Sequence, residues 1–141
     1  MKTLKSMLAG ITLLFICVAT NAIAKPANGK PTKDDVVKIY IDAIANGKIS
    51  NLNKVLDDDL QFNMQRGENV NTLNKDELLD YLKNNATADL SVKTTTTVEQ
   101  DNDNSSVVKI EFKHDGYSRT DEVTLNNTNG WVITKVVSTF K

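Results

Sequence analysis

The sequence predicts an α+β cone in which three N-terminal helices pack on a strongly curved, mainly antiparallel sheet that ends in a four-stranded meander. Two observations support this prediction. In the first half of the chain, apolar residues recur every three or four positions, as on one face of a helix. From Asp89 to Lys141 they alternate with polar residues instead, and three polar turn signals separate four strand-length segments. A cone of this kind has a pocket built into it.

Residues 1–24 have the features of a secretory signal peptide. Lys2 and Lys5 form a basic start, the apolar run at 7–18 is too short to span a bilayer, and residues 21–24 end in the small-x-small pattern of a cleavage site. We therefore expect a secreted or periplasmic protein that has no membrane attachment once the signal is removed.

A lipoprotein signal centred on Cys17 is the alternative interpretation of this segment. Phe15 and Ile16, however, stand where lipid attachment requires small residues, which disfavours the alternative.

Cleavage of this segment changes the composition of the mature chain. About 117 of the 141 residues remain, which is enough for one domain with a single core. The only cysteine is lost, so a disulfide, a thiol nucleophile and a thiolate metal site are all excluded. Two lysines and no acid are lost too, so the formal charge of −1 becomes about −3. A mildly acidic chain without a basic cluster is a poor nucleic-acid binder.

Residues 25–32 contain two prolines and a glycine, and we expect them to form a flexible leader before a domain at 33–141. Thr32 and Asp35 can form a capping box at the start of the first helix, which Asn46-Gly47 ends. A second, shorter helix is predicted from Ser50 to Leu56, with the acidic run 57–59 after it.

A hairpin and a third helix follow. Leu60, Phe62 and Met64 alternate with polar residues before a turn at 66–69, which is typical of a short hairpin. Asn74 can then cap a helix, with Glu77 as its reciprocal partner and Asn84-Asn85 at its end.

The meander is predicted as four strands. Alternating residues place them at 90–98, 108–112, 117–125 and 131–140, and Asp115-Gly116 is a tight hairpin signal. In the last strand, apolar residues fall on both faces. Either both faces are covered or a bulge near Lys135 switches the inward face, and we expect the bulge because a strongly curved sheet needs one.

The order of these elements resembles the nuclear transport factor 2-like (NTF2-like) superfamily. The segment Gly130-Trp131-x-Ile133-x-x-Val136-x-x-x-Phe140 at the end of the meander contributes to the resemblance, which extends from Thr32 to Lys141. Within the superfamily the chain is similar to small secreted proteins of Bacteroidetes-type bacteria, including a grouping labelled putative lumazine-binding. The superfamily contains isomerases, dehydratases, epoxide hydrolases, polyketide cyclases and non-catalytic binders, so the resemblance implies a fold and not a mechanism.

The best candidates for chemistry lie on the fifth strand, where Tyr117, Arg119 and Asp121 share one face. The resemblance implies an acidic base and a tyrosine donor in the pocket, which would be Asp121 and Tyr117. Alternatively, Arg119 and Asp121 neutralise each other on an ordinary sheet surface. His114 stands beside Asp115 in what we expect to be an exposed turn, so a catalytic dyad of these two would lie away from any pocket.

Neither a metal nor a cofactor is predicted. Asp101, Asp103 and Ser105 imitate the start of a calcium loop, but Ser106 and Phe112 stand where its glycine and its bidentate glutamate should be. The Asp57 to Asp59 run is expected to be solvated.

The aromatic residues outline a ligand pocket in the cone. We expect it to be lined by Tyr40, Phe62, Met64, Tyr81 and Trp131, with Tyr117 and Arg119 as its polar groups. The alternative is a filled core, because the same side chains could pack against one another.

Three functions are therefore open. The first is a non-catalytic module that binds a small apolar or aromatic ligand, and the second is an interaction module that forms a homodimer through the outer face of the sheet. The third is a small, cofactor-independent lyase or isomerase with an Asp/Tyr pocket. The outer face is predicted to be polar, with Lys93, Thr95, Thr97, Lys109, Glu111, Lys113, Thr120, Glu122 and Thr124 on it.

Overall fold

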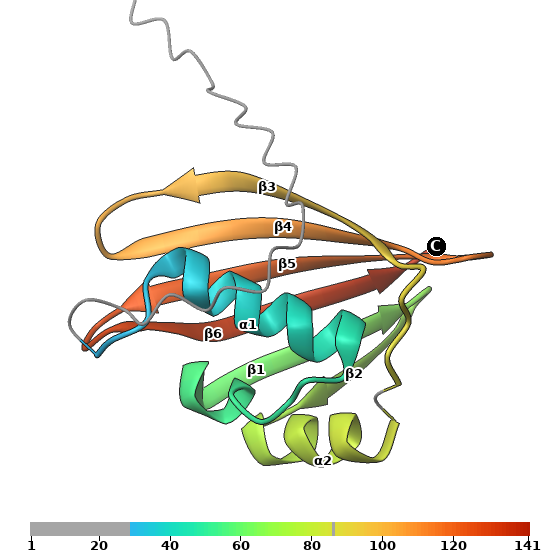
Figure 1. Ribbon diagram of the computed structural model, residues 1–141, viewed down its shortest axis with the longest axis horizontal. Helices are drawn as coiled ribbons and strands as arrows, with labels where there is room; N and C mark the ends of the chain where they lie inside the picture. The colour runs from blue at the N-terminus through green and yellow to red at the C-terminus, as the bar shows by residue number, and fades with distance from the viewer. Residues whose placement is uncertain (1–28, 86) are drawn as a thin grey trace, which may run out of the picture.

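The computed structural model describes residues 29–85 and 87–141, which form a six-stranded mixed sheet with two α-helices and one short 3₁₀ helix (Figure 1). The predicted signal peptide and the first residues of the predicted leader lie outside the described residues. No helix in the described ranges is long and apolar enough to cross a membrane.

Helix α1 (Lys33–Asn46) has the predicted boundaries. The Thr32 hydroxyl accepts a hydrogen bond from the backbone N–H of Asp35, whose carboxylate accepts one in return from the N–H of Thr32. Gly47 ends the helix with a φ of 66°, a left-handed conformation that glycine adopts without steric cost. The inward face of the helix buries Val36, Tyr40 and Ala43 completely.

The prediction of a second α-helix is wrong. Only a 3₁₀ turn, η1 (Leu52–Val55), forms there, and strand β1 (Leu56–Arg66) begins at once, so the acidic run 57–59 is part of a strand. Leu56 pairs with Ile133 of the last strand and is 3% exposed. This distant pairing draws the chain into an extended conformation before an α-turn can be completed.

Strand β1 forms the predicted hairpin with β2 (Asn69–Leu73), and α2 (Lys75–Asn85) follows. The predicted capping box of α2 is confirmed, because the Asn74 side chain accepts from the N–H of Glu77 and the Glu77 carboxylate accepts from the N–H of Asn74. Leu78 and Leu82 of this helix are buried in the same core as α1.

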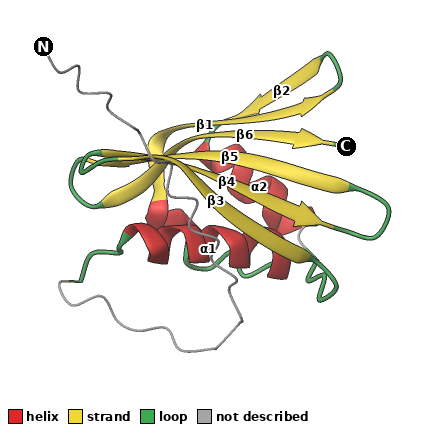
Figure 2. Cartoon of the chain, turned by 90° about the horizontal axis from the view of Figure 1, so that it is seen from above, coloured by secondary structure: helices red, strands yellow, loops and turns green. Residues whose placement is uncertain are grey.

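The meander consists of β3 (Lys93–Asp101), β4 (Ser105–Lys113), β5 (Ser118–Asn127) and β6 (Trp131–Phe140). The sheet order is β2-β1-β6-β5-β4-β3, with β1 parallel to β6 and every other pair antiparallel. Seen from above, the strands converge at one end and spread at the other (Figure 2).

The first meander strand starts three residues later than predicted. Leu90 is 92% exposed and lies before the strand. The Asp89 carboxylate accepts hydrogen bonds from the N–H and the hydroxyl of Ser91, and this local turn prevents residues 89–91 from joining the ladder.

The predicted bulge in the last strand is confirmed. Thr124 pairs with Lys135 and the next residue, Leu125, pairs with Ile133, so Thr134 is the extra residue. Because of this shift, both Ile133 and Val136 are fully buried although they are three residues apart. The outer face is polar, with Glu111, Lys113 and Glu122 exposed on it.

Candidate functional site

The site is built around an ion pair on the inner face of β5. Arg119 and Asp121 are two residues apart, so their side chains leave the same face of the strand. The guanidinium binds the carboxylate in a bidentate manner, with Nε 2.8 Å from Oδ1 and Nη2 2.7 Å from Oδ2. Asp121 is fully buried, whereas the Arg119 side chain keeps 12% of its surface exposed.

Tyr40 of α1 completes this unit. Its hydroxyl donates a hydrogen bond of 2.6 Å to Oδ2 of Asp121, 81 residues away in sequence. Complete burial raises the pKa of Tyr40 well above its usual value, and the neighbouring Asp121 carboxylate raises this pKa further. The phenol therefore stays protonated and holds the carboxylate in place.

The Arg119 guanidinium is also surrounded by aromatic rings. Its Cζ atom lies 5.6 to 5.8 Å from the ring centroids of Phe62, Phe112 and Phe140. Burial by itself lowers the pKa of Arg119, but the Asp121 carboxylate outweighs this effect, so the net change in pKa is upward and the charge is permanent.

One nitrogen of Arg119 remains open. Nε and Nη2 are engaged with Asp121 and Tyr40, whereas Nη1 has no hydrogen-bond partner among the described residues. Nη1 is not fully buried either, because Oγ of Ser138 is the only buried side-chain N or O atom without a partner in the described residues. The two N–H groups of Nη1 are therefore accessible from the pocket that Arg119 lines.

This pocket, the mouth pocket, lies between the end of α2, the β4–β5 turn and the ends of β1 and β6, and has a volume of about 640 Å³. It lies at the end of the sheet marked C in Figure 1. Its lining includes Arg66, Tyr81, Asp89, His114, Tyr117, Arg119 and Phe140. Tyr81 and Tyr117 are 38% and 49% exposed, so two aromatic side chains are available to a ligand here.

A second cluster holds one wall of the mouth pocket. Nδ1 of His114 lies 3.1 Å from Oδ2 of Asp89, and the imidazole stacks on Tyr117 with ring centroids 4.3 Å apart. Hydrogen bonds from Ser91 and then from His114 hold the pKa of the Asp89 carboxyl below its usual value. The turn is exposed at Asp115 and Gly116 as predicted, but its histidine is not, because the His114 side chain is only 14% exposed and pairs with Asp89.

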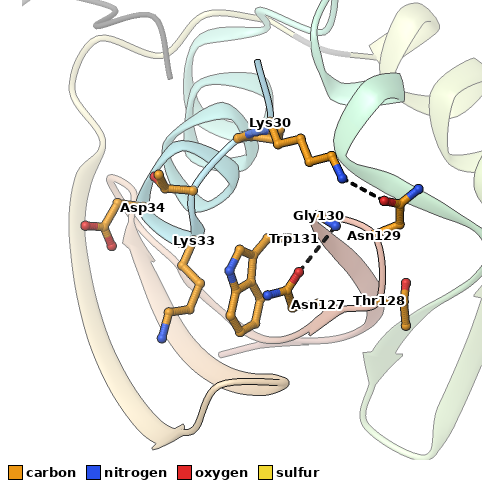
Figure 3. Close-up of a pocket in the computed structure, with 10 residues that line it drawn as sticks. Lys30, Lys33, Asp34, Asn127, Thr128, Asn129, Gly130 and Trp131 are labelled. Atoms are coloured by element: carbon orange, nitrogen blue, oxygen red, sulfur yellow. Dashed lines mark hydrogen bonds between the residues drawn. The ribbon is translucent and has the colours of Figure 1, made fainter. Parts of the chain in front are cut away.

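Another pocket, of about 580 Å³, lies at the opposite end of β6 between the start of α1 and the β5–β6 turn (Figure 3). Trp131 lines it, with the ammonium of Lys33 4.9 Å from the ring centroid. Both lysines here have partners, since Lys30 donates to Asn129 and Lys33 pairs with Asp101. We call it the Trp131 pocket.

The residues predicted to line one pocket are thus distributed over three places. Tyr81, Tyr117 and Arg119 line the mouth pocket, whereas Trp131 lines the other pocket. Along β6, Trp131 lies nine residues before Phe140 of the mouth pocket, a distance of about 30 Å. Tyr40 and Phe62 are buried in the core, and Met64 packs partly buried against it. Among the described residues, the inner aromatic side chains of Tyr40 and Phe62 are packed in the core, and the two pockets lie at opposite ends of β6.

The proposed catalytic pair is not in contact. Asp121 binds Tyr40 and Arg119, and Tyr117 stacks on His114. The pocket also contains four residues that the sequence pattern did not indicate: Arg66, Asp89, His114 and Phe140. The alternation of β1 and β6 gave no sign of this, because the pocket forms where strand ends distant in sequence meet.

Within residues 29–85 and 87–141, no group of three or more His, Cys, Asp or Glu side chains is arranged to hold a metal ion.

Comparison with solved structures defines the fold class. An NTF2-like protein from Shewanella baltica aligns with a TM-score of 0.67 and 12% identity, over 77% of this chain and 90% of that one. A cystatin-like fold protein from Burkholderia xenovorans gives 0.62 and 15%, over 76% and 87%. A DUF4783 family protein from Bacteroides uniformis gives 0.53 and 17%, over 74% and 95%. The chain therefore has the NTF2-like fold.

The family follows from the sequence itself. A family model described as "Putative lumazine-binding" matches residues 31–139, so the chain belongs to this family. No curated protein matches the chain.

Proposed function

We propose that the protein is a small-molecule-binding module whose ligand is a planar aromatic compound held in the mouth pocket. The observation that carries this proposal is the combination of two partly exposed tyrosines with an immobilised guanidinium in one cavity of about 640 Å³. Ligand pockets are commonly apolar and aromatic, with a few well-placed polar groups, and this cavity has both. The description of the family supports a heterocycle of the lumazine type as the first ligand to test.

The geometry favours binding over proton transfer. Each oxygen of Asp121 accepts a hydrogen bond from Arg119 or Tyr40, and the carboxylate is fully buried. A general base must be within hydrogen-bond reach of its substrate, and this carboxylate is covered by its own partners. Its role in the proposal is to position Arg119.

Calorimetric titration of the purified protein with lumazine tests the proposal. Because ring stacking contributes about 0.5–1.5 kcal/mol per aromatic pair, we expect Tyr81→Ala and Tyr117→Ala each to weaken binding several-fold. Trp131→Phe, at the far end of β6, is the matched control and should bind as the wild type does. Weakening by Trp131→Phe alone would move the ligand to the Trp131 pocket, and no binding of any aromatic compound would overturn the proposal.

We further propose that the protein is secreted and forms a homodimer through the outer face of the sheet. This face supports the proposal because it is polar and carries alternating charges at Lys109, Glu111 and Lys113. Light scattering of the protein lacking residues 1–24 should give twice the chain mass, and reversing the charge of Glu111 and Lys113 should lower it. A monomer mass at every soluble concentration would contradict the dimer.

A further inference from the structure

Cationic side chains outnumber carboxylate side chains among the described residues that line the mouth pocket. The described cationic side chains that line it are Arg66, Arg119 and Lys141, whereas the only carboxylate side chain among the described lining residues, that of Asp89, is already bound to His114. The whole sequence has a formal net charge of −1. A cleft with one sign of charge concentrates ligands of the opposite sign, even on a protein with an opposing net charge.

The two arginines share one aromatic ring. The Cζ atoms of Arg66 and Arg119 lie 4.8 and 5.6 Å from the centroid of Phe140. Contacts of this kind hold a guanidinium against a ring while leaving other N–H groups free to bind. The two guanidinium groups therefore lie beside the same ring, Arg66 on β1 and Arg119 on β5, the two strands that flank β6.

The two arginines differ in how they are held. Arg119 is fixed by Asp121 and Tyr40 and directs only Nη1 to the pocket, whereas Arg66 is exposed and forms no ion pair with a described residue. The buried Asp121 lies behind Arg119, so the positive end of that ion pair faces the ligand. A rigid donor and an adjustable cation that line the same cavity can form a binding site for an oxyanion.

The Trp131 pocket provides the contrast. It also has two cationic side chains, but Lys30 is hydrogen bonded to Asn129 (Figure 3) and Lys33 is paired with Asp101. The Lys33 hydrogen bond lowers the pKa of the Asp101 carboxyl, so this pair is already formed at neutral pH. Its cations are occupied by the chain's own groups.

We propose that the mouth pocket selects aromatic ligands that carry an oxyanion, a carboxylate or a phosphate, which binds Nη1 of Arg119 and the guanidinium of Arg66 while the ring lies against Tyr81 or Tyr117. This inference rests on the proposed function and assigns the chemical class of its ligand. Guanidinium groups suit both oxyanions, because their planar N–H donors match the oxygen atoms of either.

A matched set of probes tests this inference. 2-Naphthoate, 2-naphthyl phosphate and the neutral 2-naphthamide present the same ring system with different heads, and calorimetry of the purified protein gives their affinities. We expect one or both anions to bind about tenfold more tightly than the amide in low salt, with a smaller ratio in high salt. The better of the two anions identifies the ligand as a carboxylic acid or a phosphate ester.

Variants then assign the effect to the two arginines. Arg66→Gln changes an exposed side chain and should reduce the anion-to-amide ratio towards one, because the anions lose a cation that the neutral amide does not need. Arg119→Gln should do the same if the protein still folds without the buried ion pair, and Arg66→Gln suffices if it does not. Lys33→Gln, in the Trp131 pocket, is the control and should keep the ratio.

The outcomes separate this inference from the proposed function. Equal affinities for the amide and both anions would overturn the oxyanion inference while leaving an aromatic-binding module. A ratio unchanged by Arg66→Gln would also overturn it. If lumazine binds but none of the three probes does, the oxyanion inference is wrong and the proposed function stands. If neither lumazine nor any probe binds, both are wrong.

Discussion

The hydroxyl of Tyr40 is the residue-scale feature with the clearest energetic consequence. It donates to a fully buried carboxylate that also carries the ion pair with Arg119. Hydrogen bonds to charged groups contribute about 1.5–3 kcal/mol, so Tyr40→Phe should lower the free energy of unfolding at neutral pH by about that amount. Arg119 still pairs with Asp121 in this variant, so the fold should be retained.

The same residue makes a prediction about alkaline pH. The folded-state pKa of Tyr40 is raised above the usual 10.0, so above that pH the unfolded chain loses the proton while the folded chain keeps it. The stability contributed by Tyr40 is therefore fully present below pH 10 and is lost as the pH rises through the folded pKa. The difference in unfolding free energy between wild type and Tyr40→Phe should shrink by about 1.4 kcal/mol per pH unit in this range.

Urea denaturation of both proteins between pH 7 and pH 11 measures this difference. Below pH 9 the difference serves as its own control, because the phenol is protonated in both the folded and the unfolded state. A constant difference across the whole range would show that Tyr40 does not titrate differently in the two states.

Among the helices and strands, the sequence predicted correctly those features that depend on residues close together in the chain. The capping residues Thr32 and Asn74 fixed the starts of both α-helices, and the change of apolar parity beside Lys135 revealed the bulge. The 3₁₀ turn was predicted as a helix because the spacing of Leu52, Val55 and Leu56 fits a helix as well as the start of a strand. The pairing of Leu56 with Ile133 determines the structure here, and the residues near Leu56 in sequence do not indicate it.

The candidate site was predictable only where its partners are close in sequence. Arg119 and Asp121 share a strand face, so their mutual neutralisation was among the sequence-based alternatives, whereas Tyr40 reaches Asp121 from a different element. For His114, the acidic neighbour in sequence is Asp115, but the fold brings Asp89 to it from 25 residues away. Partners of this kind depend on the register of the whole sheet, which is a property of the folded chain.

At the scale of the whole molecule, the strand order determines which parts of the sheet open first. Strand β5 is hydrogen bonded along its length to β4 and β6, and its inward residues Val123 and Leu125 are fully buried. Strand β3, in contrast, is an edge strand whose last residues are exposed, and β2 is the short edge strand on the other side.

Backbone amides at the centre of the core should therefore exchange only through global unfolding, and those of edge strands through local opening. We expect the amides of β5 to be the slowest to exchange with deuterated solvent and those of β2 and β3 to be faster by orders of magnitude, as resolved by NMR at single residues. Addition of an aromatic ligand should slow exchange at the β4–β5 turn and the end of β6, because these segments form the mouth pocket. Equal protection of β3 and β5 would mean that the sheet opens as one unit, and slowing confined to the β5–β6 turn would place the ligand in the Trp131 pocket.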